Sequence, residues 1–195
     1  MIRTILFALL FLIAAGVGYL SFQWYRMQQN TQVASYGAPF TLIDQNGQPF
    51  TQDDLNTKPS ALFFGFTHCP QICPTTLYEL TALAEQLGTD AEKLQTVFVT
   101  VDPERDTPEV MKLYLSNVSA RTIGLSGKPE DVMAMTKAYG IYSKKVPLDD
   151  GDYTMDHTAS VILLDGNGDF FGTIAYEENT QTALAKLQRL VAKGS

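Results

Sequence analysis

Two cysteines separated by three residues are the part of this sequence best suited to metal or redox chemistry. Cys69 and Cys73 lie in the segment GFTHCPQICPTTL and are the only two cysteines of the chain. Each precedes a proline, which disfavours helical backbone at the cysteine, and Pro74 suits the first position of a helix. We therefore expect Cys73 at or just before the start of a helix and Cys69 on the preceding loop. The unpaired N–H groups and the dipole of that helix end would stabilise a thiolate.

The spacing of the two cysteines leaves several uses open. Thioredoxin-type oxidoreductases favour two intervening residues, whereas three give the sulfurs more freedom to lie on either side of an ion. A redox disulfide between Cys69 and Cys73 needs only a suitable Cα separation and suitable Cβ directions. A buried structural pair and a stabilising disulfide are further alternatives, although closing so short a loop restrains the unfolded chain little.

His157 is the third residue that could join this chemistry. It precedes the apolar run ASVILLD, and the only other histidine of the chain is His68. In a thioredoxin-like fold, the loop entering that strand faces the cysteine loop, so His157 can complete a site of two sulfurs and one nitrogen. The alternative is a histidine held only by hydrogen bonds in a loop. His68 adjoins Cys69, and strand alternation would direct the two side chains to opposite faces.

The number of available ligands favours copper over zinc. A structural zinc site usually has four protein ligands, and here the fourth would have to be His68. Two thiolates and one imidazole suit Cu(I), and a weak additional ligand would also allow Cu(II). Cys69, Cys73 and His157 are therefore the predicted metal ligands.

The elements that must position these residues predict an α/β domain. A hairpin is expected around Asn46-Gly47, and the apolar runs SALFFGF and LQTVFVTVD indicate buried strands separated by a helix. Thr107-Pro108 begins a further helix. We expect a strand at RTIGLSG, a helix ended by Gly140, a long loop or irregular hairpin at 141–157, a closing strand pair and a last helix at 180–192. This order predicts a thioredoxin-like fold, in which helices flank a central mixed sheet that carries an N-terminal hairpin and an insertion.

The amino-terminal segment has a different composition. Residues 4–25 contain no charged side chain, and 22 helical residues span about 33 Å, enough for a bilayer core of about 30 Å. We predict a transmembrane anchor at 1–26, a tether at 27–38 and a globular domain at 39–195. A cleaved signal peptide is the alternative, because Gly16-Val17-Gly18 offers small residues. Either interpretation places the domain outside the cytoplasm, at a bacterial inner membrane facing the periplasm or at its mitochondrial equivalent.

The net charge of −7 argues against nucleic-acid binding. An acidic domain repels phosphate backbones. A basic protein partner would fit this charge better.

Three segments together resemble the Sco/SenC family of copper chaperones. They are GFTHCPQICPTTL, VTVDPERDTPEVMKLYL and DHTASVILLD, in this order. The resemblance implies a thioredoxin-like fold with two cysteines and a distant histidine as metal ligands, which match Cys69, Cys73 and His157. It also implies assembly of the binuclear copper site of cytochrome c oxidase, by copper donation, by thiol reduction of the receiving cysteines, or by both. The implied partners are the copper-site subunit of the oxidase and another periplasmic copper chaperone or thiol reductant.

Three aspartates are further candidates for contacting a partner or tuning the site. The family pattern suggests Asp102 and Asp106 of DPERDTP, and Asp156 directly precedes the histidine. Capping of the next helix by Asp106 or Thr107 is the simpler interpretation, and we favour it.

Binding and transfer of copper, without catalytic turnover, is the leading functional prediction. An enzyme is the second: a thiol–disulfide reductase or peroxidase with Cys69 or Cys73 as nucleophile and His157 as acid or base. No basic residue adjoins the cysteines to stabilise a peroxide-derived charge. A copper or redox sensor is the third, and it would need a separate output protein.

Overall fold

The computed structural model describes residues 7, 16–23, 36–149 and 151–193. Contacts divide the chain into two units, Met1–Ser35 and Tyr36–Ser195. In the first unit, residues 16–23 are helical. The described part of the chain contains no helix with the length and apolar character needed to cross a membrane. Most of the predicted membrane segment and tether lies outside the described residues, so both stay predictions.

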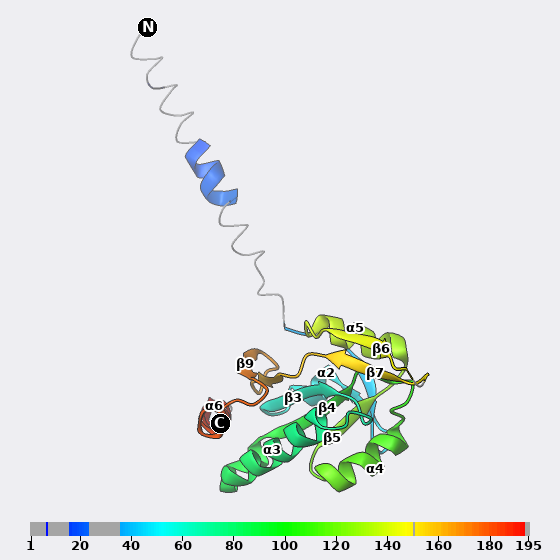
Figure 1. The fold of residues 1–195 in the computed structure, drawn as a ribbon. Coiled ribbons are helices and arrows are strands. Elements are labelled where there is room, and N and C mark those ends of the chain that lie inside the picture. The colour runs from blue at the N-terminus through cyan, green and yellow to red at the C-terminus, as the bar shows by residue number, and fades with distance from the viewer. Residues whose placement is uncertain (1–6, 8–15, 24–35, 150, 194–195) are drawn as a thin grey trace. The chain divides into compact units, whose positions relative to one another are not determined.

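The second unit is built on a seven-stranded mixed sheet with the order β2-β1-β5-β4-β3-β8-β9 (Figure 1). Its central strands β3, β4 and β5 are parallel, while β1–β2 and β8–β9 form antiparallel pairs at the two edges. The strands are β1 (Thr41–Asp44), β2 (Pro49–Thr51), β3 (Ser60–Gly65), β4 (Gln95–Thr100), β5 (Ile123–Ser126), β8 (Val161–Leu164) and β9 (Phe170–Ile174). This arrangement confirms the predicted mixed α/β sheet.

Helices cover both faces of the sheet. In Figure 1, α3 and α4 lie on one side of the strands and α5 lies on the other. Helices α3 and α4 share a face because the crossovers from β3 to β4 and from β4 to β5 have the same hand and move across the sheet in the same direction. The helices are α2 (Gln52–Leu55), α3 (Ile72–Gln86), α4 (Pro108–Val118), α5 (Pro129–Ala138) and α6 (Thr180–Lys193), with a 3₁₀ helix, η1, at Gly88–Lys93.

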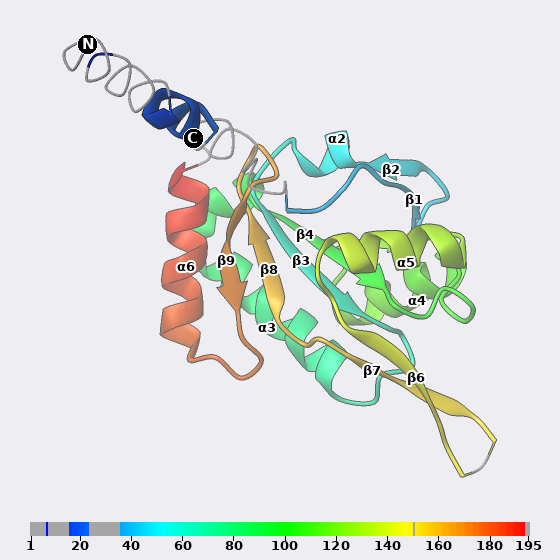
Figure 2. The same cartoon turned by 90° about the horizontal axis from the view of Figure 1, so that it is seen from above.

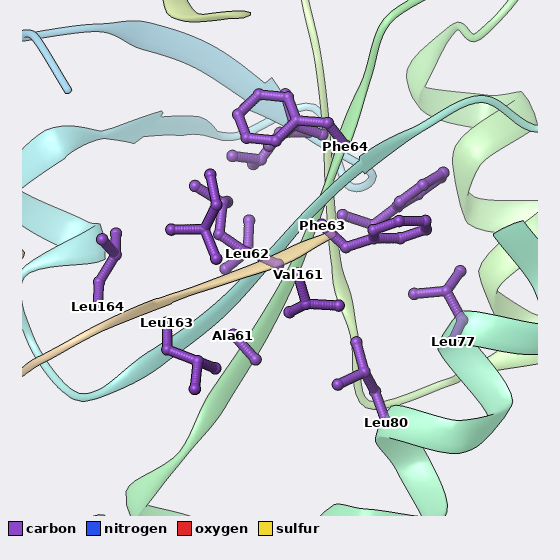
Figure 3. Packing of buried hydrophobic residues seen from close by; sticks show 14 of the residues in the cluster. Ala61, Leu62, Phe63, Phe64, Leu77, Leu80, Val161, Leu163 and Leu164 are labelled. Atoms are coloured by element: carbon purple, nitrogen blue, oxygen red, sulfur yellow. The ribbon is translucent and has the colours of Figure 1, made fainter. Parts of the chain in front are cut away.

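The core explains why residues 61–64 of β3 are all apolar. All six of its residues are buried, and successive side chains point to opposite faces. Phe63 lies toward Leu77 and Leu80 of α3, whereas Phe64 lies on the other side of the strand (Figure 3). A strand covered on both faces needs a continuous apolar run, as the sequence predicted.

The segment 141–157 is more regular than the sequence predicted. It contains the antiparallel pair β6 (Ser143–Pro147) and β7 (Tyr153–His157), a two-stranded sheet that extends away from the other elements (Figure 2). Gly151 turns the chain with a φ of 87°, a conformation that suits glycine. The hairpin buries little apolar surface of its own, so its sequence lacks the alternation that signals a strand.

The start of α3 also differs from the prediction. The helix begins at Ile72, with Gln71 as N-cap, so Cys73 is the second helical residue rather than a residue at or before the start. Pro74 then occupies the third position. The first N–H groups of a helix have no intrahelical acceptor, so a proline there removes no hydrogen bond.

The topology brings the candidate ligands to one end of the sheet. The cysteine loop leaves the carboxyl end of β3, and the segment 102–107 leaves the carboxyl end of the parallel strand β4. Strand β8 is antiparallel to β3, so its first residue lies at this same end. His157 reaches the end of the sheet near the cysteines for this reason.

Candidate metal centre

Cys69, Cys73 and His157 form a compact group of potential metal ligands. One ligand atom of each lies within 4.8 Å of the others. Both cysteines are free thiols, and the side chains of the group are buried or half-buried. The structure therefore brings together the three residues that the sequence singled out.

The two sulfurs lie at the amino end of α3. The backbone N–H of Cys73 donates to the Cys69 Sγ over 3.3 Å. Cys73 is fully buried in the first turn of the helix, while Cys69 retains an exposed fraction of 9%. Cys69 is consequently the sulfur that meets solvent and incoming molecules first.

His157 is held with one ring nitrogen toward the sulfurs. Its Nδ1 lies 2.9 Å from the carbonyl oxygen of Thr158. A carbonyl can only accept, so Nδ1 carries the proton and Nε2 of the neutral ring keeps its lone pair. Nε2 lies 3.6 Å from Cys73 Sγ. The rings of Phe63 and Phe66 pack edge-on to the imidazole, with centroids 6.2 and 5.8 Å away, and fix its orientation.

The two thiols differ in acidity. The pKa of Cys69 is lowered to about 4, chiefly by the hydrogen bond from the Cys73 side chain, with help from the N–H groups of Cys73 and Gln71. The pKa of Cys73 is raised by its hydrogen bond to Cys69 and by burial. The metal-free site therefore holds one thiolate and one thiol.

We expect this difference to appear in thiol alkylation. Iodoacetamide should modify Cys69 of the reduced, metal-free protein before Cys73, at a rate that is nearly constant from about pH 6 to 8. Because the pKa of Cys69 is lowered to about 4, the thiol is almost fully ionised throughout this pH range, and the thiolate is lost only in stronger acid. Peptide mapping by mass spectrometry measures both rates. In urea, the same cysteines should react as ordinary thiols of pKa about 8.5, and a folded profile of that kind would contradict the assignment.

Gly65 leaves room for the buried sulfur. A Cβ at this position would lie 2.7 Å from the Phe98 ring and 2.8 Å from Cys73 Sγ. Gly65→Ala should therefore destabilise the metal-free protein by about 1–3 kcal/mol, the usual cost of overpacking, and shift Cys73. Denaturant unfolding of this variant tests the expectation, and unchanged stability would refute it. Gly172→Ala is the matched control, because a Cβ there meets no atom within 4 Å.

His68 does not join the ligand group. Its Nδ1 lies 3.1 Å from the Thr67 hydroxyl and 3.8 Å from Asp106 Oδ1, and half of its side chain is exposed. The sequence argument that His68 and Cys69 diverge agrees with this placement.

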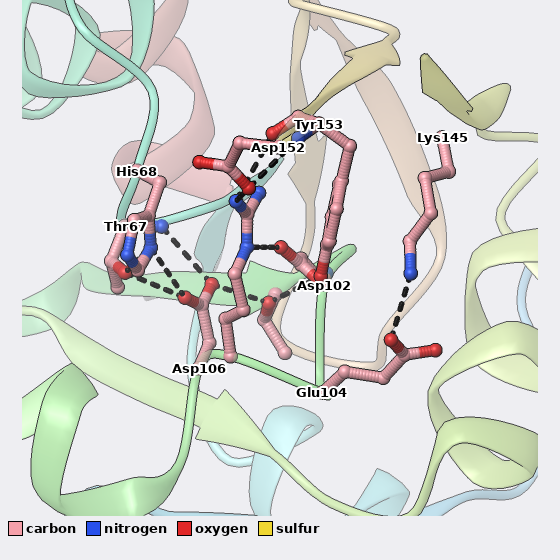
Figure 4. Close-up of polar contacts among 10 residues, drawn as sticks. Thr67, His68, Asp102, Glu104, Asp106, Lys145, Asp152 and Tyr153 are labelled. Carbon is pink, nitrogen blue, oxygen red and sulfur yellow. Dashed lines mark hydrogen bonds and ion pairs between the residues drawn. The ribbon is translucent and has the colours of Figure 1, made fainter. Parts of the chain in front are cut away.

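The candidate aspartates occupy three different environments. Thr107 is the N-cap of α4, and its hydroxyl accepts from Val110 N–H over 3.4 Å, so the predicted capping is performed by Thr107. Asp106 is completely buried and accepts from the backbone N–H and the hydroxyl of Thr67, at 3.0 and 2.6 Å (Figure 4). Asp102 is buried beside Arg105, while Asp156 is exposed.

Two residues of this region were missed by the sequence analysis. Arg105 contacts both Asp102 and Tyr153, and the sequence analysis considered only the acidic members of DPERDTP. The available signal was an arginine between two aspartates directly after a buried strand. Tyr153 gave no comparable signal, because its contacts depend on how the hairpin folds back.

Comparisons with known proteins point to one family. The sequence model of the SCO1/SenC family matches residues 28–192. Protein SCO2 of Saccharomyces cerevisiae mitochondria is 40% identical over 159 residues, covering 80% of this chain and 52% of its own. The chain spans about half to two thirds of the length of the curated relatives it matches.

Two solved structures are also similar. The copper-bound structure of Bradyrhizobium japonicum ScoI is 46% identical, with a TM-score of 0.74, and the match covers 80% of this chain and 99% of that one. The copper-bound structure of Arabidopsis thaliana ScoI is 31% identical, with a TM-score of 0.76, and covers 82% and 99%. On the extent of the family match and on these identities, the chain belongs to the SCO1/SenC family.

Proposed function

We propose that this chain is a copper metallochaperone that binds one copper ion through Cys69, Cys73 and His157. The observation that carries the proposal is the convergence of two sulfurs and one imidazole nitrogen within 4.8 Å. Binding Cu(I) to both sulfurs displaces the proton of the Cys73 thiol, because the metal ligand is the thiolate.

The ligand set supports copper as the ion. Two sulfurs and one nitrogen suit Cu(I), whereas structural zinc sites usually have four protein ligands. Among the described residues, no further cysteine, histidine or acidic side chain belongs to this group of potential metal ligands. The two similar solved structures hold copper, which supports the same choice for this chain.

The destination of the copper is proposed on the family resemblance. We infer that the chain assists assembly of the binuclear copper site of cytochrome c oxidase, with the copper-site subunit as partner. The predicted anchor at 1–26 fits this role, because it would hold the domain outside the cytoplasm, beside the membrane that carries the oxidase.

Thiol–disulfide exchange with the receiving cysteines is the second candidate function. The lowered pKa of Cys69 favours it, because the thiolate is the attacking species. Cys69 would attack a disulfide of the receiving subunit and release one of its thiolates, and the Cys73 thiolate would then attack the Cys69 sulfur of the mixed disulfide and release the second receiving thiolate. The receiving cysteines leave reduced, and Cys69 and Cys73 leave as a disulfide.

Titration of the reduced domain with Cu(I), followed by transfer to an isolated oxidase copper domain, tests both candidates. The chaperone proposal expects one copper per chain and its appearance on the acceptor. The reductase proposal expects loss of the acceptor disulfide by metal-free protein. A chain that neither binds copper nor passes it on would exclude the first function, and an acceptor that stays oxidised would exclude the second.

A further inference from the structure

The hairpin that carries His157 is separate from the main sheet. Within the described residues, β6 and β7 pair with each other and not with any strand of the seven-stranded sheet. A two-stranded hairpin alone is marginally stable at best. His157 is the last residue of β7, so its position relative to the cysteines depends on how the hairpin is docked.

Arg105 makes the densest set of docking contacts. Its Nε donates to the Asp102 carboxylate, and its Nη1 donates to the carbonyl oxygen of Tyr153 at 3.0 Å and to Asp152 Oδ1 at 3.3 Å. The guanidinium carbon lies 3.7 Å from the centroid of the Tyr153 ring. The Arg105 side chain therefore connects the acidic turn after β4 to the first residue of β7.

Asp102 completes the connection from the side of the main sheet. Its Oδ1 accepts from the Tyr153 hydroxyl at 2.9 Å, and its backbone N–H donates to the Thr100 hydroxyl at 2.8 Å. The exposed fraction of its side chain is 2%, and that of Arg105 is 17%. Removing the Arg105 guanidinium would therefore leave the buried Asp102 carboxylate without a compensating charge.

The effect of this cluster should reach His157 along β7. Tyr153 and His157 are four residues apart in one strand, so their side chains share a face about 13 Å apart. The same turn also holds the cysteine loop, because Asp106 accepts two hydrogen bonds from Thr67. The segment 102–106 thus contacts both ligand-bearing parts of the site.

We propose that Arg105 is a positioning residue for the metal site, which it serves by docking the β6–β7 hairpin and thereby holding His157 against the two sulfurs. This inference rests on the proposed copper-binding function. The exposed ion pair between Glu104 and Lys145, at 2.7 Å, is a second link to the hairpin, but exposed pairs contribute little.

A double-mutant cycle tests the inference. Arg105→Gln should weaken Cu(I) binding about 10- to 100-fold, the usual effect of removing a group that orients a ligand, as measured by competition with a chromophoric chelator. In the His157→Ala background, the same substitution should change the affinity by no more than about twofold, the range of independent substitutions. Arg121→Gln is the matched control and should leave the affinity unchanged, because Arg121 pairs with Glu92 on the exposed surface.

The outcomes separate this inference from the proposed function. Wild-type protein that binds no copper would overturn both. If the wild type binds copper and the Arg105→Gln variant binds it equally well, Arg105 does not position His157. The same conclusion follows if Arg105→Gln weakens binding by the same factor in the wild-type and His157→Ala backgrounds. Should Arg105→Gln fail to fold, Arg105→Lys keeps the charge without the planar fork, and it should show the same coupling to His157 with a smaller loss.

Discussion

Replacing Cys69 or Cys73 with alanine is expected to lower the affinity for Cu(I) several hundredfold. Structural metal sites draw about 10–16 kcal/mol from their ligands, so a strong ligand contributes about 3–4 kcal/mol, and each 1.4 kcal/mol is a factor of ten. The chain has only these two cysteines, so neither loss can be replaced by another of its thiols. Chelator competition on the reduced domain measures the effect.

A substitution beside the site serves as the control. Thr75→Ala changes an exposed residue in the first turns of the same helix and should leave the affinity unchanged. Wild-type affinity in either cysteine variant would show that the ion binds elsewhere. A reduced but measurable affinity in His157→Ala is consistent with a third ligand, whereas full affinity would remove the histidine from the set.

Replacing Asp106 with alanine should have the largest effect on stability outside the apolar core, about 2–4 kcal/mol. The carboxylate accepts from the backbone N–H and hydroxyl of Thr67 and from the hydroxyl of Thr100 at 2.6 Å. Each buried donor left without an acceptor costs about 1–3 kcal/mol, and water entering the cavity would offset part of the sum. Denaturant unfolding of the metal-free protein measures the loss.

The pH dependence of this loss has a definite sign. Burial raises the pKa of Asp106, so the folded protein holds a proton that the unfolded chain releases between the two pKa values. Wild-type stability therefore falls as the pH rises through this interval, and the difference from Asp106→Ala is largest in acid. Asp90→Ala is the control, because its ion pair with Lys93 is about half exposed and should contribute at most about 1 kcal/mol. An equally small effect for Asp106→Ala would contradict its assignment as a buried acceptor.

Local patterns predicted the parts of the fold that local forces determine. The unbroken apolar run of β3 and the Asn46-Gly47 turn were both confirmed, because burial on two faces and positive φ each select particular residues. The placement of His157 near the cysteines followed from one topological relation, the entry of its strand at the end where β3 finishes. These features need no knowledge of long-range side-chain contacts.

The missed features depend on long-range contacts. Arg105 acquires its contacts with Asp152 and Tyr153 only when the hairpin folds onto the turn after β4, and the sequence of 141–157 predicted no more than a long loop or irregular hairpin. Helix capping was predicted for Asp106 or Thr107, because an aspartate beside Thr107-Pro108 fits a cap as well as the threonine does. One actual partner of Asp106, Thr67, lies 39 residues away in the sequence.

X-ray absorption at the copper edge of the protein loaded with one Cu(I) tests the central claim most directly. The account predicts a first shell of two sulfurs and one nitrogen, and loss of that nitrogen in His157→Ala. A shell without nitrogen, or an identical spectrum for wild type and His157→Ala, would contradict the three-ligand site.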